Sequence, residues 1–234
     1  AQLTMSLAML SMAVFTVAYG GLSDRFGRKR VLMGGLVLFT CGAATCMFAA
    51  NLPMLLAGRI LQGAGAGCGV VLARAIARDV YGQDRVAQVI AYLTAAYVLG
   101  PMVAPPIGGQ LTAVFGWRAL FVFASAVGLL VIVTVAFAVP ETRARSAAAP
   151  RSVFAGYKSL LRNRRFVGFM LQPGLMSAAF YTQATAASFL AAEYLGADAA
   201  KIGLWFFAFP IGFMTGSFIS GRIGANRSIE FMTI

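Results

Sequence analysis

Long apolar runs, separated by short clusters of charged and turn-forming residues, dominate the hydropathy pattern of this chain. A helix needs about 20 apolar residues to cross about 30 Å of hydrocarbon, and most of these runs reach that length. Cutting the chain at charges, prolines and glycines predicts seven membrane-spanning helices. Their expected ranges are 3–22, 31–50, 54–77, 86–112, 118–139, 166–192 and 202–221. We therefore predict an all-α, polytopic membrane protein.

Composition excludes several classes of function. Of 234 residues, 60% are hydrophobic and 11% are charged, which leaves too few polar side chains to cover a soluble globule. The chain has no His, and its three Cys fall in apolar segments, so we expect neither a metal site nor a disulfide framework. The acidic residues fall at predicted helix ends or in loops. We expect no catalytic residues and no enzymatic activity.

The distribution of basic residues sets the predicted orientation. Fifteen of the nineteen Lys and Arg lie in the connections after the first, third, fifth and seventh predicted helices. The positive-inside rule places these connections in the cytoplasm. Arg118 and Lys201 lie on the opposite side, and Arg59 and Arg74 fall within the third predicted helix. Because the basic residues form no single face, we expect no binding to nucleic acid.

A change in composition after the fifth predicted helix divides the chain. Residues 1–140 are expected to form an N-terminal bundle, 141–165 a basic cytoplasmic linker, and 166–234 the start of a second bundle. Apolar residues at helical spacing among basic ones predict an amphipathic helix at 153–161 of this linker. The odd helix count and the apolar sequence at both ends lead us to expect a truncated bundle.

Residues 20–30, with the sequence GGLSDRFGRKR, form the most distinctive connection. Gly20 and Gly27 are expected to allow an abrupt reversal between two helices, and Asp24 to face a positive helix N-terminus. A basic cluster suited to lipid phosphate or carboxylates surrounds them: Arg25, Arg28 and Lys29. The run resembles, position by position, the G-x-L-x-D-R-x-G-R-R/K signature of the major facilitator superfamily, which joins the second and third helices of that fold.

The third predicted helix contains Arg59, Gln62 and Gly63. An arginine inside a membrane helix is costly unless it faces a water-filled cavity or a carboxylate, or extends to the outer headgroups. The run resembles the superfamily's fourth-helix motif, R-x-x-Q-G-x-G-A. That resemblance implies a role for Arg59 in proton coupling.

The fourth predicted helix holds three prolines and three glycines within residues 100–109. Such a segment is expected to bend and to let a neighbouring helix pack closely, although simple kinked packing is an alternative. It resembles the antiporter motif G-P-x-x-G-G, with Ala104 replacing the first glycine. The motif residues are Gly100, Pro101, Pro105, Gly108 and Gly109.

Charged residues at the predicted cytoplasmic ends suggest a network between helices. Arg74, Arg78 and Asp79 end the third predicted helix, and Glu141 follows Pro140 as the sixth helix commonly ends in this superfamily. We hypothesise that these residues and Asp24 form a charge network that holds the outward-facing state.

The overall order of motifs resembles the bicyclomycin- and chloramphenicol-resistance type of drug/proton antiporter, with this chain as helices two to eight of twelve. The resemblance implies alternating access, drug-like substrates, a monomer in the bacterial inner membrane, and a proton gradient as energy source without a cofactor. Polar and aromatic residues within spans are the candidates to line the substrate site, although helix packing is an alternative for each. They are Gln172, Tyr181, Gln183 and Phe206.

Two alternatives stay open. A seven-helix receptor or sensor fits the helix count, and an uptake transporter for a sugar or metabolite fits the superfamily motifs. A proton antiporter also needs a carboxylate within the membrane, and none of the predicted spans holds one. In the resembling family this acid often lies on helix one. We therefore expect that these 234 residues alone do not couple proton flow to export.

Overall fold

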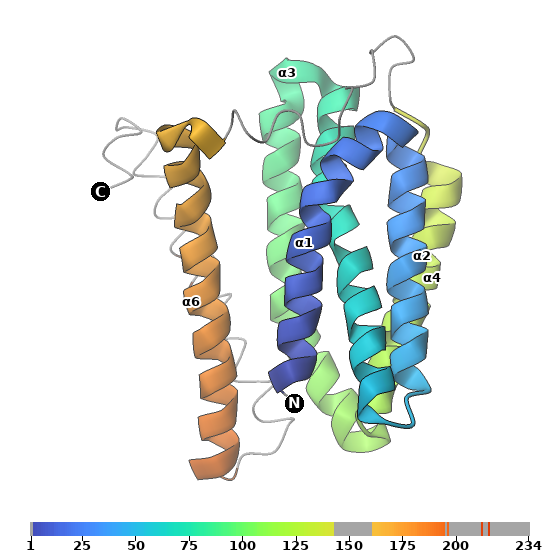
Figure 1. The fold of residues 1–234 in the computed structure, drawn as a ribbon, viewed down its shortest axis with the longest axis vertical. Coiled ribbons are helices and arrows are strands. Elements are labelled where there is room, and N and C mark those ends of the chain that lie inside the picture. The colour runs from blue at the N-terminus through green and yellow to red at the C-terminus, as the bar shows by residue number, and fades with distance from the viewer. Residues whose placement is uncertain (1, 143–160, 195, 197–211, 213–214, 216–234) are drawn as a thin grey trace. The chain divides into compact units, whose positions relative to one another are not determined.

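The computed structural model describes residues 2–142, 161–194, 196, 212 and 215, which are helical apart from short connections. The helices of this described part are α1 (Gln2–Phe26), α2 (Arg28–Met47), α3 (Leu52–Phe115), α4 (Arg118–Ala138) and α6 (Arg164–Tyr194) (Figure 1). The predicted all-α class is confirmed. Phe206 lies outside the residues described, as do the amphipathic helix expected in the linker except residue 161 and the last predicted span except residues 212 and 215.

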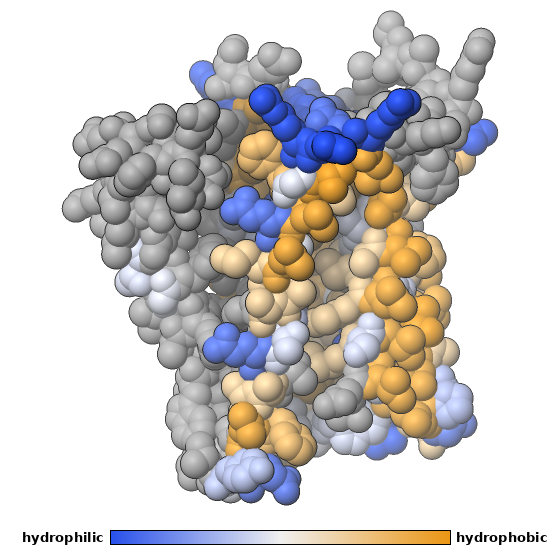
Figure 2. Space-filling model, turned by 60° about the vertical axis from the view of Figure 1, so that its left-hand side comes forward, coloured by the Kyte–Doolittle hydropathy of each residue, from blue (hydrophilic) through white to orange (hydrophobic). Residues whose placement is uncertain are grey.

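Four described segments are long and apolar enough to cross a membrane, by length and composition. They are Leu3–Phe26, Arg28–Met47, Leu52–Gly82 and Arg118–Ala138. They correspond to the first, second, third and fifth predicted spans. Figure 2 shows apolar side chains over the middle of these helices and hydrophilic side chains gathered mostly toward their ends. This pattern is that of a multi-pass membrane protein.

The connection between α1 and α2 is shorter than the sequence predicts. α1 continues to Phe26 and α2 begins at Arg28, so a single residue, Gly27, separates them. Gly27 has a φ of 100°, in the left-handed region that favours glycine. Gly20 lies within α1 and has no part in the reversal, which corrects the two-glycine loop expected above. α1 continues past the predicted end of the span at residue 22 because the polar side chains of residues 23–25 are compatible with helical backbone.

The third and fourth predicted helices are joined without a loop. Within α3, Gly82 has non-helical backbone angles, with φ 63° and ψ −171°, and the residues on both sides are helical. The antiporter-like segment 100–109 lies inside the second limb of α3. The chain groups into two compact units, one of residues 1–93 and 117–183, the other of residues 94–116 and 184–234. The Arg28 and Arg59 sites described below belong to the first unit, and the antiporter-like segment 100–109 belongs to the second.

Glycines allow α3 to approach both α1 and α2 closely. A methyl group at Gly65 would collide with the backbone of Phe39 and Gly35 on α2, and one at Gly63 would collide with the backbone of Ala8 on α1. Lipid offers no hydrophobic force to press helices together, so such backbone proximity supplies the packing energy. A buried cluster completes the packing toward the predicted cytoplasmic end: Tyr19, Leu32, Cys68, Leu72 and Val135.

We predict that Gly65→Ala destabilises the bundle, because the added methyl group meets backbone that cannot rotate away. Overpacking of this kind costs about 1–3 kcal/mol. Gly34→Ala on α2 is the matched control, since a Cβ there has nothing within 4 Å. Thermal unfolding in detergent should show a lower midpoint for Gly65→Ala than for Gly34→Ala. Equal midpoints would contradict the close approach of α2 and α3.

Candidate functional site

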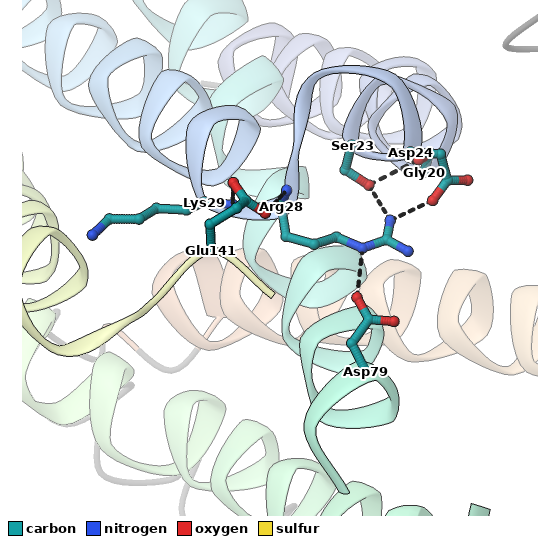
Figure 3. A network of polar contacts seen from close by, with 7 residues as sticks. All are labelled: Gly20, Ser23, Asp24, Arg28, Lys29, Asp79 and Glu141. Carbon is teal, nitrogen blue, oxygen red and sulfur yellow. Dashed lines mark hydrogen bonds and ion pairs between the residues drawn. The ribbon is translucent and has the colours of Figure 1, made fainter. Parts of the chain in front are cut away.

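The guanidinium of Arg28 joins the end of α1 to α3 (Figure 3). Its Nη1 lies 2.6 Å from Oδ1 of Asp24, and its Nε lies 3.0 Å from Oδ2 of Asp79. The Arg28 side chain is 16% exposed, against 45% for Asp24 and 25% for Asp79. Such partly buried, charge-assisted contacts are stronger than ion pairs in free solution. Arg28, the first residue of α2, is therefore the central member of a network that also includes α1 and α3.

Ser23 helps to hold the Arg28 guanidinium in place. Its hydroxyl accepts a hydrogen bond from Nη1 of Arg28 at 2.5 Å and donates one to the carbonyl of Gly20 at 2.8 Å. The residue is fully buried. Asp24 lies in the last turn of α1, where the helix dipole disfavours an acid. The positive charge of Arg28 offsets that unfavourable position.

Glu141 caps the N-terminus of α2. Its two carboxylate oxygens accept hydrogen bonds from the backbone N–H groups of Arg28 at 2.8 Å and Lys29 at 3.3 Å. A Cβ at Gly27 would lie 2.6 Å from Oε2 of Glu141, so only glycine admits the carboxylate here. The sequence places Asp24 in a capping role, whereas the structure gives that role to Glu141. Two free N–H groups and the positive end of the helix dipole account for its position.

The structure does not bring every residue of the hypothesised network together. Asp24, Asp79 and Glu141 all contact Arg28. Arg74 and Arg78 are exposed on α3, and neither forms a hydrogen bond or ion pair with a described residue. Arg25, also exposed, holds its guanidinium 5.4 Å from the centre of the Phe26 ring. Lys29 extends away from Arg28 and donates to the carbonyl of Ala136 on α4 at 2.7 Å (Figure 3).

Arg59 forms a second polar centre, near the opposite end of the bundle. Its Nε donates to the carbonyl of Thr4 on α1 at 3.2 Å, and its Nη1 donates to Oε1 of Gln62 at 2.6 Å. The guanidinium also lies 5.9 Å from the centre of the Phe121 ring on α4. The arginine is thus held between three helices instead of extending outward. Within the described part of the chain, its hydrogen-bond acceptors are neutral.

The remaining candidates lie in segments whose contacts are sparse. Gln172, Tyr181 and Gln183 are exposed on α6. Gln172 and Gln183 are eleven residues apart, about three helical turns, so they share one face, while Tyr181 lies on the opposite side. Gly100, Pro101, Pro105, Gly108 and Gly109 all lie within the second limb of α3. The roles of these residues stay predictions.

Comparisons with known proteins decide the family. A sequence profile of the Major Facilitator Superfamily matches residues 1–234. The chain belongs to this superfamily. It is therefore a member of a transporter family and not of an enzyme family, which favours transport over the receptor alternative.

Several bacterial members of the superfamily are similar in sequence. The bicyclomycin resistance protein homolog of Haemophilus influenzae is 26% identical over 99% of this chain and 59% of its own length. Multidrug resistance protein D of Escherichia coli is 32% identical over 73% of this chain and 43% of its own length. A Bacillus subtilis protein named uncharacterized MFS-type transporter YdgK is 28% identical over 95% of this chain. The chain spans about half the length of these superfamily members, from 43% to 59%.

Sequence reasoning missed Ser23 and Arg118. Ser23 occupies a variable position of the loop signature, so only its burial beside Arg28 indicates a role. Arg118 reads as an isolated charge in an outer connection, yet its Nη2 donates to the carbonyl of Ala49 at 3.0 Å. The sequence carries no signal for this contact, because its acceptor is a backbone carbonyl.

We predict that Glu141→Ala loosens the first turn of α2, because two amide groups and the helix dipole lose their partner. Loss of a cap costs about 1 kcal/mol. In Glu141→Ala, hydrogen–deuterium exchange of the peptide that contains Arg28 and Lys29 should accelerate about fivefold. The exchange rate in Glu141→Gln should fall between those of the wild type and Glu141→Ala. Thr142→Val is the control, because the Thr142 hydroxyl has no hydrogen-bond partner among described residues. Unchanged exchange in Glu141→Ala would refute the cap.

Proposed function

We propose that this protein exports drug-like molecules from bacteria by proton-coupled antiport. The names of two superfamily relatives refer to bicyclomycin and multidrug resistance, which supports this substrate class. The observation that carries the coupling proposal is Arg59. Its positive charge is held between α1, α3 and α4 by neutral acceptors, a carbonyl and an amide.

A fixed positive charge in a poorly hydrated site favours the ionised form of any carboxylate that approaches it. Proton binding to that carboxylate cancels the attraction, so the pairing with Arg59 depends on the protonation state. Gln62 holds the guanidinium in place while leaving its charge unneutralised. Arg59 thereby supplies the basic partner of a proton-sensitive ion pair. The proton gradient serves as energy source, and no cofactor is needed.

The Arg28 network acts at the predicted cytoplasmic end. Alternating access requires contacts that hold the bundle closed on one side and then release. Arg28 binds one acid on α1 and another on α3, so its two ion pairs tie these helices together. These contacts are polar and partly exposed, and water therefore replaces them at modest cost when they open. We assign the network to stabilising the outward-facing state.

The cellular location, the oligomeric state and the candidate substrate-binding residues are consistent with this proposed function. Basic cytoplasmic connections suit the bacterial inner membrane, and a monomer is sufficient for alternating access. Amide and aromatic side chains on α6 offer adaptable hydrogen bonds and stacking surfaces to drug-like substrates. Gln172 and Gln183 share a helix face and are the best pair of candidates for that wall.

We predict that Arg59→Lys abolishes proton-driven export, because the ammonium cannot keep both hydrogen bonds of the guanidinium. Everted vesicles from cells expressing the intact gene product should accumulate a fluorescent cationic drug, and a protonophore should stop this. The variant should lose at least about tenfold in initial rate, as the loss of charge-assisted hydrogen bonds implies. Arg30→Lys is the matched control at an exposed site. Uptake of a sugar with no drug transport would instead support the uptake alternative.

We predict that Asp79→Asn loosens the contact between α1 and α3, since Arg28 loses its ion pair to α3. The reporter is Cys68, which is 1% exposed, and the exposed Cys41 serves as internal reference. Labelling of Cys68 by a permeant maleimide should accelerate about three- to tenfold relative to Cys41. Arg78→Gln is the control and should label like the wild type. Equal acceleration in both variants would show that Arg78 belongs to the network.

A further inference from the structure

Two cations connect the opposite ends of α2 and α4, which lie side by side and run antiparallel (Figure 1). Lys29, in the first turn of α2, donates from Nζ to the carbonyl of Ala136 in the last turn of α4 at 2.7 Å. Arg118, the first residue of α4, donates from Nη2 to the carbonyl of Ala49, two residues after α2, at 3.0 Å. Each helix thus supplies a cation to the carboxyl end of the other.

Neither carbonyl has a backbone donor in the helical pattern. Ala136 lies in the last turn of α4 and the residue four positions later is Pro140, which has no N–H. Ala49 lies beyond the end of α2 at Met47, where the chain has left the helix, so no helical hydrogen bond reaches its oxygen. Ala49 is 4% exposed, which also restricts access of water to its carbonyl. An unsatisfied buried carbonyl is costly, so the side-chain donor contributes more than a surface contact would.

Electrostatics and packing reinforce both contacts. The carboxyl end of a helix carries partial negative charge, which attracts a cation. The Arg118 guanidinium lies 4.4 Å from the centre of the Trp117 ring, an additional contact that holds it in place. Between the two ends, Gly128 of α4 packs so closely on α2 that a methyl group there would collide with the Thr40 hydroxyl.

We propose that Lys29 and Arg118 are positioning residues that fasten α2 and α4 at both ends, so that the pair moves as one rigid body during transport. The two contacts lie about 30 Å apart, the length of a 20-residue helix. One contact would leave the helices free to splay at the far end, whereas two at opposite ends oppose splaying, sliding and rotation. The role in transport rests on the proposed function; the rigid pair does not.

The test measures the two ends separately in the purified, intact gene product. Spin labels at positions 48 and 122 report the outer end, and labels at 34 and 137 report the predicted cytoplasmic end; all four residues are exposed, and Cys41 is replaced by Ala. Electron–electron double resonance should give narrow distance distributions for both pairs. Lys29→Met should broaden the cytoplasmic pair alone, and Arg118→Met the outer pair alone.

Conservative variants distinguish the loss of the positioning contact from a general destabilisation of the fold. Lys29→Arg and Arg118→Lys keep a cationic donor and should restore narrow distributions. If a Met variant does not accumulate, Lys29→Gln or Arg118→Gln should broaden the same end, because glutamine is too short to reach the carbonyl. Arg30→Met removes an equivalent charge at an exposed neighbouring site and should leave both distributions narrow.

Transport kinetics test the positioning role. Each Met variant should lower kcat for drug export about three- to tenfold with little change in KM, because neither residue contacts the substrate. The double variant should lose more than the product of the single losses. Unchanged distributions, or broadened distributions with wild-type kcat, would overturn the proposal. End-specific broadening in a protein that exports no drug would leave the rigid pair intact and refute only the proposed function.

Discussion

The structure depends on one constraint of the bilayer: a polar backbone group that leaves the helical hydrogen-bond pattern has no water to bind within hydrocarbon. Helix ends are where such groups arise, and the described bundle meets them with charged side chains from neighbouring helices. Glu141 binds the free amides of α2, while Lys29 and Arg118 bind orphan carbonyls. Charged side chains at both ends of the bundle therefore satisfy backbone groups of neighbouring helices, and one of them, Lys29, also belongs to the basic cluster that orients the chain.

Much of the fold could be predicted because hydrophobic length is a strong signal. The spans that became α1, α2, the first limb of α3 and α4 were all expected from apolar runs between charges. Their ends were harder to place, because a helix does not stop where the hydrocarbon stops. Residues 23–26, of which three are polar, extend α1, and Gly82 alone interrupts α3 where a loop was expected. A single left-handed glycine reverses the chain, and hydropathy cannot show which glycine has that conformation.

The residues that belong to the candidate site could be predicted better than the pairs that they form. Asp24, Asp79 and Glu141 could be grouped because each lies at the same predicted side of the membrane. Which acid pairs with which donor depends on helix rotation and on distances that the sequence does not encode locally. Arg74 and Arg78 share the chemistry of Arg28 but face elsewhere. Arg118 was missed because its partner is a backbone carbonyl, and carbonyls leave no mark in a sequence.

The one-residue connection at Gly27 holds the end of α1 and the start of α2 together at the predicted cytoplasmic side. The basic cluster at 25–30 favours that side for both helix ends by the positive-inside rule. The same shortness leaves no slack in the folded protein. A displacement of the end of α1 along the membrane normal is passed directly to the start of α2.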